Sequence, residues 1–315
     1  MVRREGLEPT CLAAPAPKAG ASTNSATLAE KREKTTYYTR AVRLARSPVP
    51  VGHYENFPVA SLLLPKRLRA PIEVLYRFAR SADDIADEGD DPPHVRLGRL
   101  SVYRAELDRL EAGAAPRMAL FADIAKIARE HALPLQLFKD LLDSFTQDVT
   151  RKRYADFNEL ADYCRRSANP VGRLLLHLFK RTTEQDLARS DAICTALQLI
   201  NFWQDIDIDY AKGRVYLPQD EMARHGVSER HIAERICDER WQALLAFEVE
   251  RARALIVSGL PLARALPGRI GLEVRATIHG GLRILEKIER AGYDVFRRRP
   301  VLGRLDWALL LLRAV

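Results

Sequence analysis

Apolar residues recur at three- and four-residue spacing along most of the chain after residue 35. The segments with this period are 71–87, 95–112, 117–131, 135–149, 171–181, 186–209, 229–257 and 270–290. Such spacing gathers apolar side chains on one face of a helix. No alternating run of β-branched residues and no internal repeat of 20–50 residues is visible. The pattern therefore predicts an all-α protein of long helices packed around one core.

Turn-forming residues separate these segments. They lie at 47–52, 88–93, 112–116, 168–170, 211–214 and 266–268. Residues 1–34 are rich in Ala, Pro, Ser and Thr and lack apolar periodicity, so we expect a disordered extension there and one domain over 35–315. The apolar end "LDWALLLLRAV" is 11 residues long, and we expect a packed terminal helix, with contact to a membrane surface as the alternative.

Charge and cysteine usage narrow the partners and the compartment. The 315-residue chain carries a net charge of +8, which favours an anionic partner: nucleic acid, a lipid surface or a phosphorylated small molecule. Its four cysteines are far apart and form neither a zinc motif nor a disulfide framework, which indicates the reducing cytoplasm. The sequence contains no run of about 18 apolar residues, so no transmembrane helix is expected.

An acidic cluster ends the predicted helix 71–87, although the chain as a whole is basic. Six carboxylates fall within nine positions, from Asp83 to Asp91. The stripe it belongs to follows a spacing of 0, 4, 7 and 11 and is formed by Tyr76, Arg80, Asp83 and Asp87. At about 100° per residue these positions share a face about 60° wide. Negative charge at a helix C-terminus opposes the helix dipole, so we expect a bound cation to complement it.

A second predicted helix repeats the arrangement within "LQLINFWQDIDIDYAKGR". Its stripe, with spacing 0, 3, 7 and 11, consists of Gln198, Asn201, Asp205 and Asp209. Apolar residues surround the stripe on most sides, which is typical of a buried central helix. Buried carboxylates cost several kcal/mol unless positive charge meets them.

Two D-x-x-x-D pairs on core helices predict a site for divalent cations between them. Oxygen ligands without His or Cys favour Mg²⁺, or Mn²⁺, over zinc. Substrate phosphates usually complete such a shell, and Arg80, Lys212 and Arg214 lie near the two pairs in sequence. An apolar helical interior beside a diphosphate clamp suits a long apolar chain with a phosphorylated head, and it suits carbocation chemistry. The plain alternative for each pair is a solvated helix face.

Several longer motifs resemble the squalene/phytoene synthase family over about residues 50–300. "QLINFWQDIDIDYAKGRVYLP" resembles the second aspartate-rich motif and "YRFARSADDIAD" the first. "YCRRSANPVG" resembles the loop between them, and "ILEKIERAGYDVFRRR" the last core helix with its basic end. The resemblance implies a single-domain class I isoprenoid synthase fold, with a central cavity between two aspartate-rich helices.

The resemblance also implies roles for individual residues. Mg²⁺ is expected on Asp83, Asp84, Asp87, Asp205 and Asp209. The departing diphosphate is expected on Arg80, Lys212, Arg214 and Arg298. The cavity that holds the cation is expected to be lined by Tyr76, Gln198, Asn201, Phe57, Tyr163 and Phe202.

Departures from the family pattern point to one branch. Gln204 replaces an Arg, Asn169 and Pro170 replace small residues, and Gly281 stands where phytoene synthases commonly carry Tyr. With "HYENFPVAS" at 53–61, these features resemble hydroxysqualene synthases of bacterial squalene and hopanoid biosynthesis. That branch implies a carbon–oxygen lyase that converts presqualene diphosphate to hydroxysqualene without a nicotinamide cofactor. His53 and Asn56 are our candidates for orienting the capturing water.

Wider expectations and two rivals accompany this hypothesis. A presqualene diphosphate synthase and an oxidoreductase that reduces hydroxysqualene are the expected functional partners, and lipid substrates favour peripheral contact with the inner face of the membrane. The nearer rival is a synthase that condenses two prenyl diphosphates into presqualene diphosphate or a phytoene-type product. The remote rival is a helical module that binds nucleic acid or anionic lipid, but two acidic stripes would repel phosphate without metal.

Overall fold

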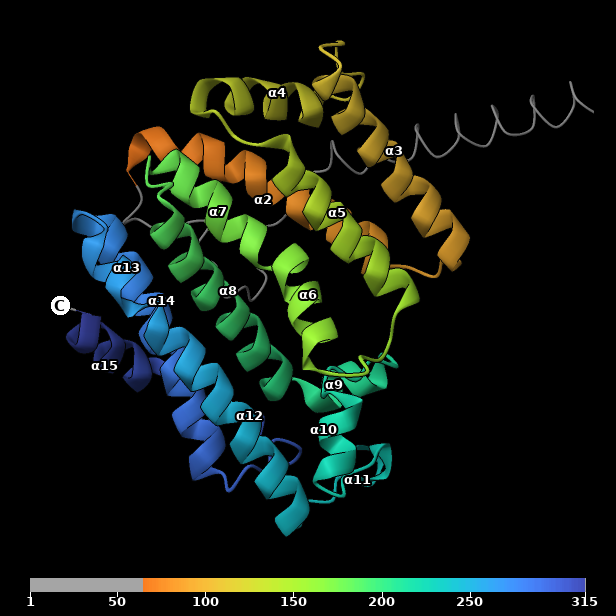
Figure 1. The fold of residues 1–315 in the computed structure, drawn as a ribbon, viewed down its shortest axis with the longest axis vertical. Coiled ribbons are helices and arrows are strands. Elements are labelled where there is room, and N and C mark those ends of the chain that lie inside the picture. Colours follow the sequence, from red (N-terminus) through yellow and green to blue (C-terminus); the bar gives the residue numbers. More distant parts are fainter. Residues whose placement is uncertain (1–64, 315) are drawn as a thin grey trace, which may run out of the picture.

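A computed structural model describes residues 65–314 (Figure 1), and this part of the chain contains helices and no strand. The helices in chain order are α2 (Lys66–Asp87), α3 (Pro93–Glu111), α4 (Ala119–His131), α5 (Leu135–Thr150), α6 (Phe157–Ser167), α7 (Asn169–Leu178), α8 (Glu184–Gln204), α9 (Ile206–Ala211), α10 (Gln219–Arg224), α11 (Glu229–Ala233), α12 (Glu239–Ser258), α13 (Leu260–Ala265), α14 (Gly268–Arg290) and α15 (Arg304–Ala314). The predicted all-α class is confirmed. The predicted extension 1–34 and the candidates His53, Asn56 and Phe57 lie outside the described residues.

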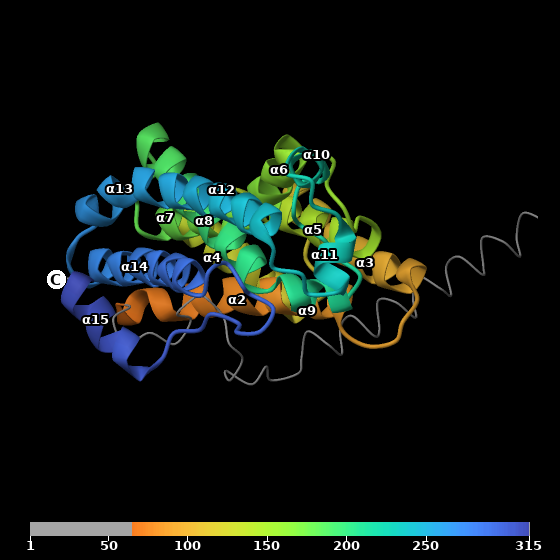
Figure 2. The same ribbon diagram turned by 90° about the horizontal axis from the view of Figure 1, so that it is seen from below.

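Helix α8 forms the centre of the fold. It packs against α6 and α7 on one side and against α12, α13 and α14 on the other (Figure 1). Helix α2 packs on α3, α4, α5 and α7. Seen from below, α2 and α14 lie toward one side of the molecule and α12 toward the other, with α8 between (Figure 2). Helix α7 contacts both acidic helices, so it stands between them as a wall.

The backbone groups at the ends of the two acidic helices find different hydrogen-bond partners. The side chain of Thr183 accepts a hydrogen bond from the backbone N–H of Asp186 and starts α8. At the C-terminus of α2, the guanidinium of Arg96 donates to the carbonyls of Ala86, Gly89 and Asp91. A cation on these carbonyls offsets the helix dipole beside the acidic cluster.

Two predicted helices are interrupted. The segment 186–209 ends as α8 at Gln204 and resumes as α9, because Asp205 leaves helical geometry (φ −110°, ψ 16°). The segment 229–257 divides into α11 and α12, because Asp238 caps the second helix by accepting from the N–H of Trp241. Asp238 makes a local side-chain bond that competes with the helical ladder, whereas the side chain of Asp205 is bonded by the distant Arg299, and apolar periodicity registers neither contact. Helices α6, α10 and α13 were not predicted from the pattern.

The terminal segment folds as α15 and packs on α14, which confirms the predicted packed helix. Asp306, which is buried, accepts a 2.7 Å hydrogen bond from Arg283 Nε, and Lys287 lies 2.5 Å from its second oxygen. Leu310 is buried, whereas Leu305 and Leu312 are exposed. No helix in the range 65–314 has the length and apolar character needed to cross a bilayer.

Candidate active site

The two aspartate-rich segments meet through an arginine. Arg214, which follows α9, donates from Nη1 to Asp87 Oδ2 at the end of α2 over 2.9 Å, and its Nη2 bonds the other carboxylate oxygen. Lys212 Nζ lies 3.8 Å from the same carboxylate. The sequence separates Asp87 from Arg214 by 127 positions, so the contact places both motifs at one site.

The first motif contains two carboxylates in opposite electrostatic states. Burial alone would raise the pKa of Asp87, but Arg214, with help from Lys212 and Lys152, holds that pKa below its usual value. Burial and the charge of Asp87 raise the pKa of Asp83 to about 7, although Arg80 opposes the shift. Asp83 is therefore the carboxylate of this pair that lacks sufficient positive charge.

The second motif repeats this division. Asp205 accepts a 2.9 Å hydrogen bond from the amide of Asn201 and a 3.1 Å bond from Arg299 Nη2, and the Nε of Arg299 bonds its other oxygen. Burial and the charge of Asp205 raise the pKa of Asp209 to about 7. Asp87 adds a smaller upward shift to the pKa of Asp209.

Asp84 shares the guanidinium of Arg80 with two other carboxylates. It lies 2.9 Å from Arg80 Nε, and the same guanidinium contacts Asp83 at 3.2 Å and Glu88 at 2.7 Å. Because Asp84 is one residue past Asp83, it points about 100° away around the helix. Arg80 therefore contacts three of the carboxylates at the C-terminal end of α2.

Two further residues enter the site that motif spacing did not indicate. Asp148, buried on α5, accepts a 2.8 Å hydrogen bond from the hydroxyl of Tyr163, and burial raises its pKa to about 6. Lys152 follows one turn later and donates to the carbonyl of Asp148 over 2.6 Å. The only available signal was an Asp at the end of an apolar helix followed by the basic run 151–153. Only the packing of α5 against α2 and α6 brings these residues to the site.

Four aromatic rings form a floor beside the carboxylates. Phe202 and Tyr216 stack in parallel with centroids 3.7 Å apart. Tyr163 lies next to both rings, and Tyr154 completes the cluster, 5.5 Å from Tyr163 and 5.8 Å from Tyr216. Phe202 and Tyr216 also share a small pocket with Asp209 and Arg214. The predicted cavity residues Tyr163 and Phe202 thus lie next to the acidic site.

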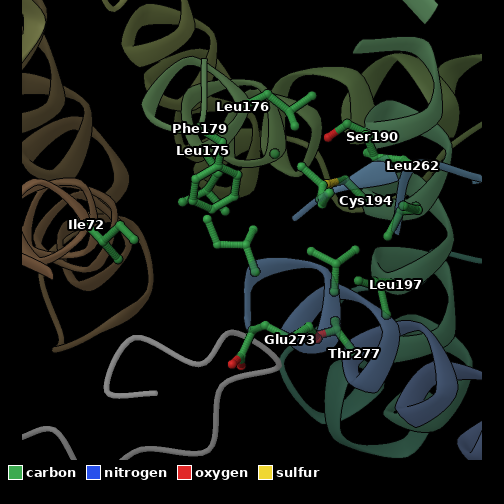
Figure 3. A pocket seen from close by; sticks show the side chains of 15 residues that line it. Ile72, Leu175, Leu176, Phe179, Ser190, Cys194, Leu197, Leu262, Glu273 and Thr277 are labelled. Carbon is green, nitrogen blue, oxygen red and sulfur yellow. The ribbon is translucent and has the colours of Figure 1, made fainter. Parts of the chain in front are cut away.

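Two apolar cavities flank α7. One is lined by α2, α5 and α7 and includes Tyr76 and Ala79. The other is lined by α2, α7, α8, α13 and α14; in it Leu175 and Phe179 lie opposite Leu197 and Leu262 (Figure 3). Ile72 and Leu175 belong to both linings and separate the two spaces.

Close helix packing shapes the second cavity. A Cβ on Gly172 of α7 would lie 2.4 Å from Ser190 Oγ and 2.5 Å from Cys194 Sγ, so only glycine allows α7 and α8 to approach this closely. Leu197 precedes Asp205 by eight residues, or about 12 Å along α8. Tyr76 precedes Asp83 by seven residues, or about 10 Å along α2. Each cavity therefore includes a residue about two turns before an aspartate of the acidic site.

The structure locates the remaining predicted residues as follows. Gln198 lies half-buried on α8, one turn before Asn201. Arg298, the predicted diphosphate ligand, is exposed, whereas its neighbour Arg299 contacts Asp205. The reason is the chain direction at Pro300, whose carbonyl accepts a hydrogen bond from buried Gln204 and fixes Arg299 over α8.

The side-chain oxygens at the site supply only part of the coordination shell of a divalent cation. Within residues 65–314, no three His, Cys, Asp or Glu side chains approach closely enough to hold a metal alone. The donors present are carboxylate oxygens, as Mg²⁺ prefers, and Asp83 and Asp209 have raised pKa values that a cation would lower. Each motif offers a pair, so phosphate oxygens and water would complete the coordination.

Comparison with known proteins decides the family. Residues 51–306 match the family model described as squalene/phytoene synthase. The chain belongs to the squalene/phytoene synthase family. The family acts on prenyl diphosphates and uses a divalent metal to ionise the diphosphate, which agrees with two carboxylate pairs on helices that also line apolar cavities.

Relatives with two different activities resemble this member of the squalene/phytoene synthase family. A hydroxysqualene synthase of Rhodopseudomonas palustris is 36% identical over 222 residues, covering 70% of this chain and 74% of the relative. The 15-cis-phytoene synthase of Synechococcus elongatus is 30% identical over 263 residues, covering 80% and 85%.

Solved structures confirm the class I isoprenoid synthase fold. The crystal structure of squalene synthase HpnC from Alicyclobacillus acidocaldarius has a TM-score of 0.72 and 35% identity, covering 83% of this chain and 96% of that one. A dehydrosqualene synthase, at 20% identity, shares the fold with a TM-score of 0.74 over 90% of this chain and 96% of its own.

Proposed function

We propose that this synthase converts presqualene diphosphate to hydroxysqualene. One observation carries the proposal: two carboxylate pairs and their arginines meet at one site, and two apolar cavities lie about two turns away along α2 and α8, with α7 as a wall between them. A substrate with one diphosphate and two prenyl arms matches such a forked space. Its diphosphate would lie at the acidic site and each arm in one cavity.

Different residues would have different roles in this reaction. Asp83, Asp87, Asp205 and Asp209 would hold Mg²⁺, which draws electron density from the diphosphate and assists its departure. Arg214 and Lys212 would bind the leaving group, and Arg299, in place of Arg298, would act from the opposite side. The aromatic floor and the amides of Asn201 and Gln198 would stabilise the cyclopropylcarbinyl cation while it rearranges. Water then adds as hydroxyl and releases a proton.

Three departures from the family pattern support this branch. Buried Gln204 bonds the carbonyl of Pro300, which positions Arg299 where an Arg at 204 would otherwise supply charge. Buried Asn169 accepts from Thr195 over 2.9 Å and ties α7 to α8. A Cβ at Gly281 would lie 2.8 Å from Ile256 and 3.0 Å from Leu197, so a Tyr there requires a different packing of α8 and α12.

The decisive experiment supplies the purified protein with Mg²⁺ and a single substrate, without NADPH. Presqualene diphosphate alone is expected to give hydroxysqualene, identified by mass spectrometry. Farnesyl diphosphate alone is expected to give no presqualene diphosphate. Formation of presqualene diphosphate or a phytoene-type product from linear prenyl diphosphates would establish the condensing activity of the second candidate function.

The water-orienting role of His53 and Asn56 is a separate proposal, since both lie outside the described residues. His53→Ala and Asn56→Ala are expected to lower the yield of hydroxysqualene relative to hydrocarbon by-products. An unchanged rate and product ratio would remove both residues from the mechanism.

A further inference from the structure

Lys152 differs in its partners from the arginines that bind the carboxylates of the site. Arg80 contacts three carboxylates, Arg214 binds Asp87, and Arg299 binds Asp205. The ammonium of Lys152, by contrast, donates to the carbonyl of Asp148 over 2.6 Å and forms no ion pair with any carboxylate in the described range. Its charge is therefore not neutralised by a contacting carboxylate.

The backbone holds Lys152 where it is. Its carbonyl accepts a 3.0 Å hydrogen bond from the N–H of Val215, the residue after Arg214. Arg153, next in the chain, donates to the carbonyls of Lys152 and Gly213. These bonds join the end of α5 to the segment that follows α9, so Lys152 and Arg214 are fixed as neighbours.

The closeness of Lys152 and Arg214 brings two positive charges together, which repel each other. Lys152 is half-buried, and burial together with the charge of Arg214 lowers its pKa, although Asp87 and Asp148 oppose this shift. Such an arrangement is unfavourable in the free protein and becomes favourable when an anion binds between the two charges.

We propose that Lys152 binds the diphosphate of the substrate, from a position beside Arg214 and next to the acidic pair of α2. The inference rests on the proposed function, because it assigns the leaving group to this cation. A lysine offers three donors on a compact charge, and it suits phosphate oxygens whose positions change as the diphosphate departs.

The test measures binding of inorganic pyrophosphate with Mg²⁺ to the full chain by calorimetry. Lys152→Gln is expected to weaken binding about tenfold, the scale of one charge-assisted hydrogen bond, whereas Lys152→Arg stays within about threefold of the natural protein. The matched control is Arg151→Gln, because Arg151 is adjacent, exposed and paired with Glu159; its affinity is expected to be unchanged.

Each result has a distinct meaning. If the natural protein binds Mg²⁺–pyrophosphate and Lys152→Gln binds it within twofold as tightly, the role of Lys152 is wrong while the proposed function stands. If the natural protein does not bind it, the proposed phosphate site itself is wrong.

A second measurement does not depend on a folded variant. Acetylation of lysines in the natural protein, followed by mass spectrometry, is expected to slow at Lys152 at least about fivefold when Mg²⁺–pyrophosphate is added, since a bound anion covers the amine. Exposed Lys126 on α4 serves as the internal control. Equal acetylation of Lys152 with and without pyrophosphate would overturn the proposal.

Discussion

The two aspartate-rich motifs pair carboxylates with arginines in a similar way, although their backbones differ. On α2 both aspartates lie on one continuous helix, and its C-terminal carbonyls are covered by Arg96. In the second motif the helix breaks at Asp205, so Asp205 and Asp209 belong to different segments. In each motif an arginine from a distant segment holds one aspartate, and the other aspartate has a pKa raised to about 7.

In both motifs one carboxylate is paired with a distant arginine, and the other has too little positive charge nearby. Because the two backbones differ, this difference between the carboxylates does not follow from helix geometry. Asp87 and Asp205 are anchored by Arg214 and Arg299, which hold the two motifs in place. Asp83 and Asp209 carry the repulsion that a cation would relieve. The experiments below test this division.

The largest effect is expected when both under-compensated carboxylates are removed. Asp83→Asn with Asp209→Asn should lower the rate of presqualene diphosphate consumption by more than about 1,000-fold, because metal binding and leaving-group stabilisation fail together. The melting temperature without metal should rise, since buried repulsion is gone, and Mg²⁺ with pyrophosphate should no longer raise it. Activity within tenfold of the natural protein would contradict the division.

Loss of the bridging arginine should affect both stability and rate. Arg214→Gln leaves Asp87 without its main partner and should reduce the free energy of unfolding by about 3 kcal/mol, measured in urea, with an activity loss of about 100-fold. Adding Asp87→Asn should recover part of the stability, since the two residues are coupled. Strictly additive losses would show that the pair is not energetically linked.

Two adjacent arginines provide a matched comparison at the second motif. Arg299→Gln should lower kcat/KM about 30-fold because Asp205 loses its anchor, whereas Arg298→Gln, on the exposed neighbour, should change it less than about twofold. Steady-state kinetics on both variants, with melting temperatures as a folding check, decide between them. A reversed order would restore Arg298 as the functional residue.

The pH dependence of stability should follow the raised pKa values. Asp83 and Asp209 bind protons more tightly in the folded chain than at their usual value of 3.8, so the stability they contribute is present at low pH. Their contribution should fall as pH rises from about 4 to about 7 in chelator, and affinity for Mg²⁺ should increase over the upper part of that range. Urea unfolding at several pH values measures this. The double Asn variant should show a flatter profile, and an identical slope would exclude these groups as its source.

The smallest effect is expected at the helix end. Arg96→Gln removes a cation from the carbonyls that end α2 and should cost about 1 kcal/mol in urea unfolding. Arg109→Gln is the control, because Arg109 donates to the carbonyl of Ala115 just past α3, away from the site. A larger rise in the Mg²⁺ concentration needed for half-maximal activity in Arg96→Gln than in Arg109→Gln would tie the cap to the first motif.

Local pattern predicted much of the helical framework and the residues of both motifs, because helix faces and their side-chain order depend on neighbours within a few turns. It failed where a side chain from a distant segment intervened. Asp205 leaves the helix where Arg299 binds its side chain, although 94 positions separate the two residues. Arg298 and Arg299 could not be told apart, because the chain direction at Pro300 depends on Gln204 in α8.

The sequence by itself determined the all-α class, the two acidic stripes with their nearby cations, and the family resemblance, since all of these depend on residue type and spacing. Only the tertiary structure decided which cation meets which carboxylate. It brought Asp148 and Lys152 from α5 and the residues after it, and it placed α7 as the wall between two cavities. The physical reason is that charge pairing and burial depend on distances across the packed helices, which no local pattern contains.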